Sequence, residues 1–161
     1  MSYWREVSKC DAEARQIARP HYSRAKPDSA ELGPPGQKIV LVGNDGQQLW
    51  GSHRPAPWVK EVKRMDGFDG HSCFIFRRAG GPLASDTIRE AVALTVEKWG
   101  AAPFITYVAI DKVRRKRDPG RCFIKAGFHK AGIQQKTKHG PMLRLEMGLF
   151  DVIHCFQERA K

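Results

Sequence analysis

A chain of 161 residues in which 41% of the side chains are hydrophobic can bury one sizeable core, which excludes an intrinsically disordered protein. No apolar run approaches the roughly 18 residues that cross a membrane, and the first residues lack the basic start and apolar stretch of a signal peptide, so we expect a cytoplasmic protein. The formal net charge of +11 indicates an anionic partner.

Hydrophobic periodicity and turn residues divide the chain into helices and strands. The expected elements are, in chain order, a helix over 1–20, strands over 38–42 and 48–51 joined by a Gly-Asn-Asp-Gly turn, a loop over 51–70, a strand over 72–77, a helix over 86–99, a strand over 103–110, a short helix from Pro119 to Ala126, and strands over 127–130 and 142–147. Because helices alternate with strands in the second half, we expect an α/β (α+β) fold, a mixed sheet with helices packed on it, in one domain over 1–161.

The helix over 86–99 has the clearest signals in the chain. Ser85 is a favourable N-cap, and Gly100 is a typical helix end. An apolar stripe recurs at helical spacing and should be buried, Trp99 included; it comprises Ile88, Ala91, Val92, Thr95 and Trp99.

A glycine turn between a strand and this helix is a candidate phosphate site. Backbone N–H groups at a helix N-terminus lie beside the positive end of the dipole, and arginines add bidentate donors. A plain connecting turn explains the same residues about as well. The candidate donor-binding residues are Arg77, Arg78, Ala79, Gly80, Gly81 and Ser85.

The succession of strand, glycine turn, helix, strand and short helix resembles the GNAT superfamily of N-acyltransferases. In that superfamily an Arg/Gln-x-x-Gly-x-Gly/Ala loop holds the pyrophosphate of acyl-coenzyme A, and a later helix ends in Tyr-x-x-x-Gly-Phe. Arg77-Arg-Ala-Gly80 and Gly127-Phe128 fit these patterns, whereas Pro82 replaces the last small residue. Phe123 stands where the family often has a tyrosine acting as general acid, which leaves the acid role open.

This resemblance covers roughly residues 38–147. It implies a GNAT-like sheet that splays at its centre, with helices on both faces, and an acyl-coenzyme A or related donor.

A narrower resemblance is to the Mom family of bacteriophage DNA-modification proteins. The matching residues are His21-Tyr22-Ser23, the turn before Ser85, and Thr106-Tyr107-Val108 followed by Asp111. Members of that family are GNAT-like enzymes that convert adenine in DNA to a carbamoylmethyl derivative and so protect phage DNA from restriction. The resemblance implies the same kind of reaction here, in the host cytoplasm.

Five residues are candidates for catalysis: His21, Tyr22, Ser23, Tyr107 and Asp111. A histidine with a pKa near neutrality can accept a proton from an attacking amine, and a tyrosine can donate one. Packing against the first helix explains His21 and Tyr22 almost equally well. Tyr107 and Asp111 are candidates by resemblance only, since a tyrosine in a buried strand is by default part of the core.

Positive charge is concentrated between residues 112 and 140. That segment has ten Lys or Arg and one acid, Asp118, which leaves +9 of the formal +11. The pattern favours DNA as partner, while a solubilising face or a site for coenzyme phosphates remains the alternative. The candidate nucleic-acid-binding residues are Lys112, Arg114, Arg115, Lys116, Arg117, Arg121 and Lys125.

Cysteine and histidine spacing does not indicate a metal. The four cysteines form no CxxC pair, so we expect reduced and mostly buried thiols, and the six histidines show no ligand spacing. Trp58 in a proline-rich stretch is a candidate for base stacking.

Three functions fit the sequence. The first is a GNAT-like transferase that modifies a nucleobase in DNA, with the adenine amine as acceptor. The second is a nucleic-acid-binding module that kept the fold and lost the chemistry, which Phe123 and Pro82 favour. The third is a GNAT N-acyltransferase that acts on a small amine.

Overall fold

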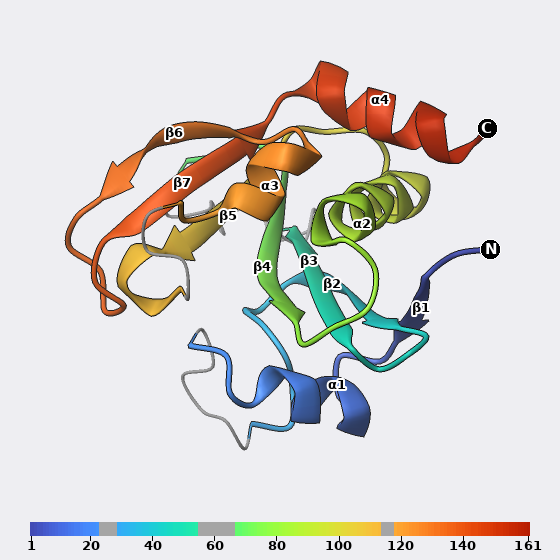
Figure 1. The fold of residues 1–161 in the computed structure, drawn as a ribbon, viewed down its shortest axis with the longest axis horizontal. Coiled ribbons are helices and arrows are strands. Elements are labelled where there is room, and N and C mark those ends of the chain that lie inside the picture. Colours follow the sequence, from blue (N-terminus) through green and yellow to red (C-terminus); the bar gives the residue numbers. More distant parts are fainter. Residues whose placement is uncertain (23–28, 55–66, 114–117) are drawn as a thin grey trace. The chain divides into compact units, whose positions relative to one another are not determined.

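The structure is a computed structural model that describes residues 1–22, 29–54, 67–113 and 118–161 (Figure 1). Within these residues the chain divides into two compact units, Met1–Gly81 and Pro82–Lys161, which we call the N-terminal and C-terminal units. The elements are β1 (Trp4–Val7), α1 (Ala12–Ala18), β2 (Gln37–Gly43), β3 (Gln48–Arg54), β4 (His71–Arg78), α2 (Ala84–Trp99), β5 (Phe104–Ala109), the 3-10 helix η1 (Ile110–Lys112), α3 (Arg121–Ala126), β6 (His129–Gln134), β7 (Met142–Met147) and α4 (Leu149–Arg159).

The N-terminal unit is an antiparallel sheet in the order β1-β2-β3-β4, with α1 packed against it (Figure 1). The expected hairpin is confirmed, because β2 and β3 pair around a turn in which Gly46 has φ +71°. The small residues of α1 bring the helix close to the apolar face of the sheet. This core contains Ala14, Ala18, Leu32, Val40, Val42, Leu49 and Ile75.

The expected helix over 1–20 is wrong in its first half. Trp4 is buried at 4% exposure, and its strand pairs with β2 from Trp4 opposite Gly43 to Val7 opposite Val40. The helix begins only after Asp11, whose carboxylate accepts a hydrogen bond from Ala14 N at 2.9 Å. Long-range pairing of the backbone therefore overrides a local helical periodicity at this point.

A bulge interrupts β4 at Phe74. Gly51 lies opposite Ile75 and Ser52 lies opposite Cys73, which leaves Phe74 without a partner across the ladder. Its ring covers Gly51 so closely that a Cβ there would lie 2.3 Å from the ring. Gly51 therefore leaves the space that the Phe74 side chain fills.

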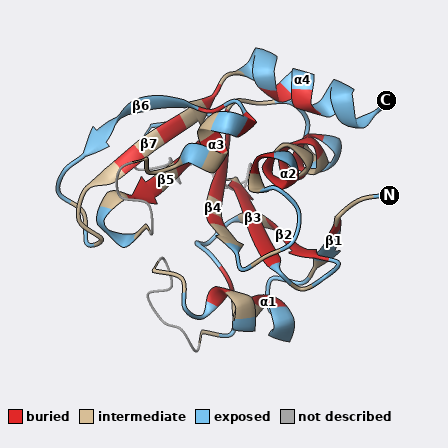
Figure 2. Cartoon of the chain, viewed as in Figure 1, coloured by how far each residue is buried: buried red, intermediate tan, exposed pale blue. Residues whose placement is uncertain are grey.

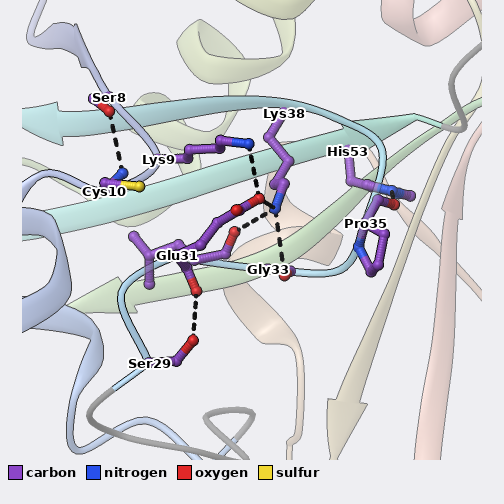
Figure 3. Close-up of polar contacts among 10 residues, drawn as sticks. Ser8, Lys9, Cys10, Ser29, Glu31, Gly33, Pro35, Lys38 and His53 are labelled. Carbon is purple, nitrogen blue, oxygen red and sulfur yellow. Dashed lines mark hydrogen bonds and ion pairs between the residues drawn. The ribbon is translucent and has the colours of Figure 1, made fainter.

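Residues 31–35, which precede β2, are held by buried polar side chains (Figure 3). Lys38 Nζ pairs with the Glu31 carboxylate and donates to Leu32 O at 2.9 Å. His53 Nε2 lies 2.7 Å from Pro35 O. Lysine and histidine side chains of β2 and β3 therefore hold residues 31–35 in place.

The C-terminal unit is an antiparallel sheet in the order β5-β7-β6, with α2 in contact with both α3 and α4 (Figure 1). Helix α2 has buried and exposed parts (Figure 2). Its apolar stripe is buried as expected at Ile88, Val92 and Thr95, whereas Trp99, also expected to be buried, is half-buried. The short helix α3 is confirmed, and it starts after Gly120, whose φ is +75°.

Two expectations for this unit are corrected. Helix α2 begins at Ala84 with Leu83 as its N-cap, whereas Ser85 lies inside the first turn at 7% exposure. Sequence analysis also assigns no element after Met147, yet α4 follows at once. Val152 and Cys155 of α4 are buried, and α4 contacts α2.

The α/β class is confirmed, and two further features of the chain can be reported. No α-helix in the part described here is both long and apolar enough to cross a lipid bilayer. All four cysteines are free thiols; Cys73 and Cys155 are buried as expected, whereas Cys10 is exposed. Burial raises the pKa of the Cys155 thiol.

Candidate donor-binding turn and catalytic residues

The end of β4 is tied to the hairpin turn between β2 and β3. Ala79 N donates to Gln47 O at 2.8 Å, and the fully buried Gln48 donates from Nε2 to Gly80 O at 3.0 Å. Arg78 Nη2 donates to Gly81 O at 2.9 Å, and Gly81 has φ +79°. The arginine–glycine turn, residues 78–81, thus has a defined conformation within the N-terminal unit.

This arginine–glycine turn has the donors that a phosphate group needs. Within the described chain no acceptor is recorded for the N–H of Gly80 or Gly81, and Gly81 is exposed. The guanidinium of Arg78 is exposed beside them, and Arg77 is half-buried. Backbone N–H groups and an arginine are the groups that bind phosphate oxygens, so the turn is a candidate phosphate-binding site.

In the C-terminal unit, the N-terminus of α2 has free donors of the same kind. Leu83 caps the helix without a side-chain hydrogen bond. No acceptor is recorded, among the residues described, for the N–H groups of Leu83, Ala84 or Ser85. The first N–H groups of a 16-residue helix therefore point outward at the positive end of its dipole.

Comparisons with known proteins agree with this fold. No model of a known protein family matches the chain, and no curated protein matches its sequence. The structure is similar to the crystal structure of aminoglycoside 6'-acetyltransferase type Ii, with a TM-score of 0.60 and 12% identity over 91% of this chain and 96% of that chain. The fold is GNAT-like. The expected GNAT-like α/β fold is thereby confirmed, while the resemblance to the Mom family stays a prediction.

His21 and Tyr22 are brought together at the end of α1 in this GNAT-like chain. His21 N donates to Ala18 O at 2.8 Å, and the two rings stack with centroids 4.3 Å apart. Both side chains are half-buried, which leaves each partly accessible. Ser23, the third candidate of this group, lies outside the described residues.

Tyr107 and Asp111 lie on consecutive elements of the C-terminal unit, β5 and η1. Tyr107 is half-buried on β5 opposite Arg144, and Asp111 is exposed on η1. A Cβ at Gly140 would lie 3.3 Å from Asp111 Oδ2, so the carboxylate adjoins the turn before β7. The described candidates thus divide between the two units, with His21 and Tyr22 in one and Tyr107 and Asp111 in the other.

Phe123 occupies the position that often holds an acid tyrosine in GNAT enzymes. It is 6% exposed, and its ring packs edge-on against Phe128 with centroids 5.4 Å apart. This side chain is part of the apolar core of the C-terminal unit, and its phenyl ring cannot donate a proton. Phe123 therefore cannot act as a general acid.

The basic segment is only partly described. Lys112 and Lys125 are exposed, whereas Arg121 pairs with Asp118 at 3.2 Å; Arg114, Arg115, Lys116 and Arg117 lie outside the described residues, as does Trp58. Burial and the charges of Lys138 and Lys112 lower the pKa of His139. Lysines from η1 and from the turn before β7 therefore share one region.

A metal centre is not indicated by the residues that the structure places. Among these, no group of three or more His, Cys, Asp or Glu side chains could hold a metal ion.

Sequence reasoning missed the residues that support the arginine–glycine turn. Tyr3, Asp45 and Gln48 lie 33 or more positions from Gly81, and only the fold brings them to it. The Asn-Asp-Gly turn was recognised as hairpin chemistry, but nothing in the sequence connects its aspartate to a turn in another part of the chain.

Proposed function

We propose that this protein is a GNAT-like N-acyltransferase that transfers an acyl group from an acyl-coenzyme A donor to an amine. The observation that carries the proposal is the arginine–glycine turn at the end of β4, with exposed N–H donors and Arg78. It lies in a chain that shares its fold with an acetyltransferase. The turn would hold the donor's phosphates through hydrogen bonds to ionised oxygens.

The donor would supply an acyl group activated as a thioester. In the transfer, the amine nitrogen attacks the carbonyl carbon, an N–C bond forms and the C–S bond breaks. The amine must lose a proton and the departing thiolate must gain one. His21 is the residue we assign to accept the amine proton, and Tyr22, whose ring stacks on it at 4.3 Å, is the residue we assign to donate.

A small amine is the acceptor that the comparison supports. The similar structure is that of an enzyme named for acetylating aminoglycosides, which are small molecules with several amino groups. Buried Phe123 does not oppose this assignment, because Tyr22 offers another hydroxyl.

Titration calorimetry with coenzyme A, together with thiol release from acetyl-coenzyme A over a panel of small amines, tests this function. The parent should bind coenzyme A, and Arg78→Ala should weaken binding by about 1–3 kcal/mol, the usual contribution of a hydrogen bond to a charged group. Arg5→Ala is the matched control, because Arg5 is an exposed arginine of the same unit that pairs with Glu13. A parent without affinity for coenzyme A would show that the assignment is wrong.

The amine of a nucleobase in DNA is the second candidate acceptor. The observation that favours it is the charge of residues 112–140, which have ten cations against one acid, more than the phosphates of one coenzyme need. Mass analysis of nucleosides from DNA of cells that express the protein would detect the modified base. DNA binding without any modified base would instead support a non-catalytic nucleic-acid-binding module.

A further inference from the structure

Tyr3 and Asp45 form a hydrogen-bonded pair beside the arginine–glycine turn. The Tyr3 hydroxyl donates to Asp45 Oδ1 at 2.6 Å, and the same oxygen accepts from Gln47 N at 2.9 Å. Tyr3 precedes β1, and Asp45 lies in the turn between β2 and β3. The pair therefore joins two segments of the N-terminal unit that are 42 residues apart.

The same pair closes around Gly81. A Cβ at Gly81 would lie 2.6 Å from Asp45 Oδ2 and 3.0 Å from the Tyr3 hydroxyl. A Cβ at Gly43, on β2, would lie 2.3 Å from the same hydroxyl. The Tyr3 hydroxyl is thus enclosed by the backbone of β2, the hairpin turn and the arginine–glycine turn, and only glycine permits so close an approach.

The negative charge of Asp45 argues against direct contact between this pair and the donor. Asp45 is an anion, and its hydrogen bond from Tyr3, followed by that from Gln47 N, lowers its pKa. A carboxylate this close to Gly81 would repel a phosphate, so direct contact with the donor is the wrong role for it. Asp45 Oδ1 accepts one hydrogen bond from Tyr3, ahead of β1, and one from Gln47 N in the hairpin turn, so this carboxylate supports the turn.

We propose that Tyr3 and Asp45 are positioning residues that hold the Gly80–Gly81 backbone in the conformation that binds the donor's phosphates. The inference rests on the proposed function and adds to it the two residues that preorganise its phosphate-binding turn. Preorganisation matters because a loose turn must be ordered at the moment of binding, which weakens the affinity.

Three substitutions separate support through hydrogen bonds from support through charge. Tyr3→Phe removes the hydroxyl and keeps the ring over Gly43. Asp45→Ala removes both hydrogen bonds, whereas Asp45→Asn removes the charge and keeps an oxygen for Tyr3 and Gln47. Asn44→Ala is the matched control, because it deletes a hydrogen bond to Ser2 O in the same hairpin turn, away from Gly81.

Affinity for coenzyme A and the steady-state constants are the first readout. Tyr3→Phe, which loses one hydrogen bond, should raise the Kd for coenzyme A and the KM for acetyl-coenzyme A about fivefold or more, with kcat nearly unchanged. Asp45→Ala, which loses two, should raise both constants at least as much. Asp45→Asn should have the parent's Kd or a lower one, because it also removes the charge that repels a phosphate, and Asn44→Ala should stay near the parent. An Asp45→Asn variant that behaves as Asp45→Ala, or a Tyr3→Phe variant with the parent's Kd, would overturn the inference.

Amide hydrogen exchange at Ala79, whose N–H donates to Gln47 O at 2.8 Å, is the second readout, measured without any donor. Exchange there should quicken in Tyr3→Phe and Asp45→Ala and stay slow in Asn44→Ala. If the parent binds no coenzyme A, the proposed function fails, and the donor role of this pair fails with it. If the parent binds coenzyme A but the exchange rates do not differ, the positioning role alone is wrong.

Discussion

Lys38 is a lysine whose side chain is only 2% exposed, which requires partners for all of its donors. It pairs with Glu31 and donates to the carbonyl oxygens of Leu32 and Gly33. Lys9 binds the same carboxylate from the other side at 2.9 Å. These two lysines lower the pKa of Glu31 to about 2. Because the buried Lys38 needs this partner, the Glu31 carboxylate is important for the conformation of the residues just before β2.

The first prediction at the scale of residues concerns acid stability. Because the pKa of Glu31 falls from 4.5 to about 2 on folding, its contribution to stability is complete above about pH 4.5 and is lost as the pH falls toward 2. Glu31→Gln should therefore be less stable than the parent at pH 7, and the difference should shrink as the pH falls through this range. Denaturant unfolding at a series of pH values measures it.

Glu13→Gln is the control for this prediction. Glu13 pairs with Arg5 where both side chains are more than 40% exposed, so its loss should change stability by no more than about 1 kcal/mol. An equal and pH-independent loss in both variants would contradict the role of Glu31.

Single residues were predicted well where their effect is local. Gly46 in the hairpin turn, Gly100 at the end of α2 and Gly127 at the end of α3 all have positive φ, as turn and helix-end residues should. Asp45 shows the opposite case. Its hydrogen bonds follow from turn chemistry, but its closeness to Gly81 depends on how three strands align, which no local pattern records.

At the scale of elements, cap signals were less reliable than burial patterns. Ser85 was expected to cap α2, yet its side chain is buried within the first turn and Leu83 takes the cap position. The stripe of α2 was predictable because its buried face repeats over four turns.

The sequence analysis does not predict helix α4, although Gly148 and the apolar residues after it are typical of a helix. It contacts α2, with ion pairs from Arg89 to Glu158 and from Arg159 to Glu97 across the two helices. Its apolar residues lie on two faces, only one of which is buried, and this spread weakens the periodic signal.

We predict that α4 stabilises the C-terminal unit through its buried face alone. Val152 is fully buried, so Val152→Ala should cost about 1.5–3 kcal/mol through lost burial and the cavity that remains. Phe150 is 84% exposed, and Phe150→Ala should change stability by no more than about 0.5 kcal/mol. Chemical denaturation of both variants measures the contrast. Equal losses would show that the exposed face of α4 is covered in solution.

At the scale of the whole molecule, the alternation of helices and strands was enough to predict the fold class. The structural similarity holds at only 12% identity, which shows that two chains can share this fold with few identical residues. The candidate site was less predictable. Its arginine–glycine turn came from a motif, whereas the two pairs His21–Tyr22 and Tyr107–Asp111 were suggested by resemblance, and their roles stay predictions.

The charge of the chain is also a property of the whole molecule. In the described part of residues 112–140, the only acid, Asp118, pairs with Arg121. Ion pairs elsewhere in the described residues use some of the remaining cations, as Arg5, Lys9, Arg89 and Arg159 do. A net charge of +11 is therefore least compensated along this segment, which makes it the place to test for DNA binding.

If this segment binds duplex DNA, affinity should fall steeply with salt, because each phosphate contact releases counterions with a log–log slope of about −0.9. Neutralising Arg114, Arg115, Lys116 and Arg117 together should flatten that slope by about three or four units and weaken binding to all sequences alike, since phosphate contacts do not read bases. Neutralising four exposed cations elsewhere, Arg5, Lys9, Arg19 and Lys98, removes the same charge and should leave the slope nearly unchanged. Fluorescence anisotropy at several salt concentrations measures both. Equal flattening in the two variants would assign binding to net charge, and binding that ignores salt would exclude this segment as the contact surface.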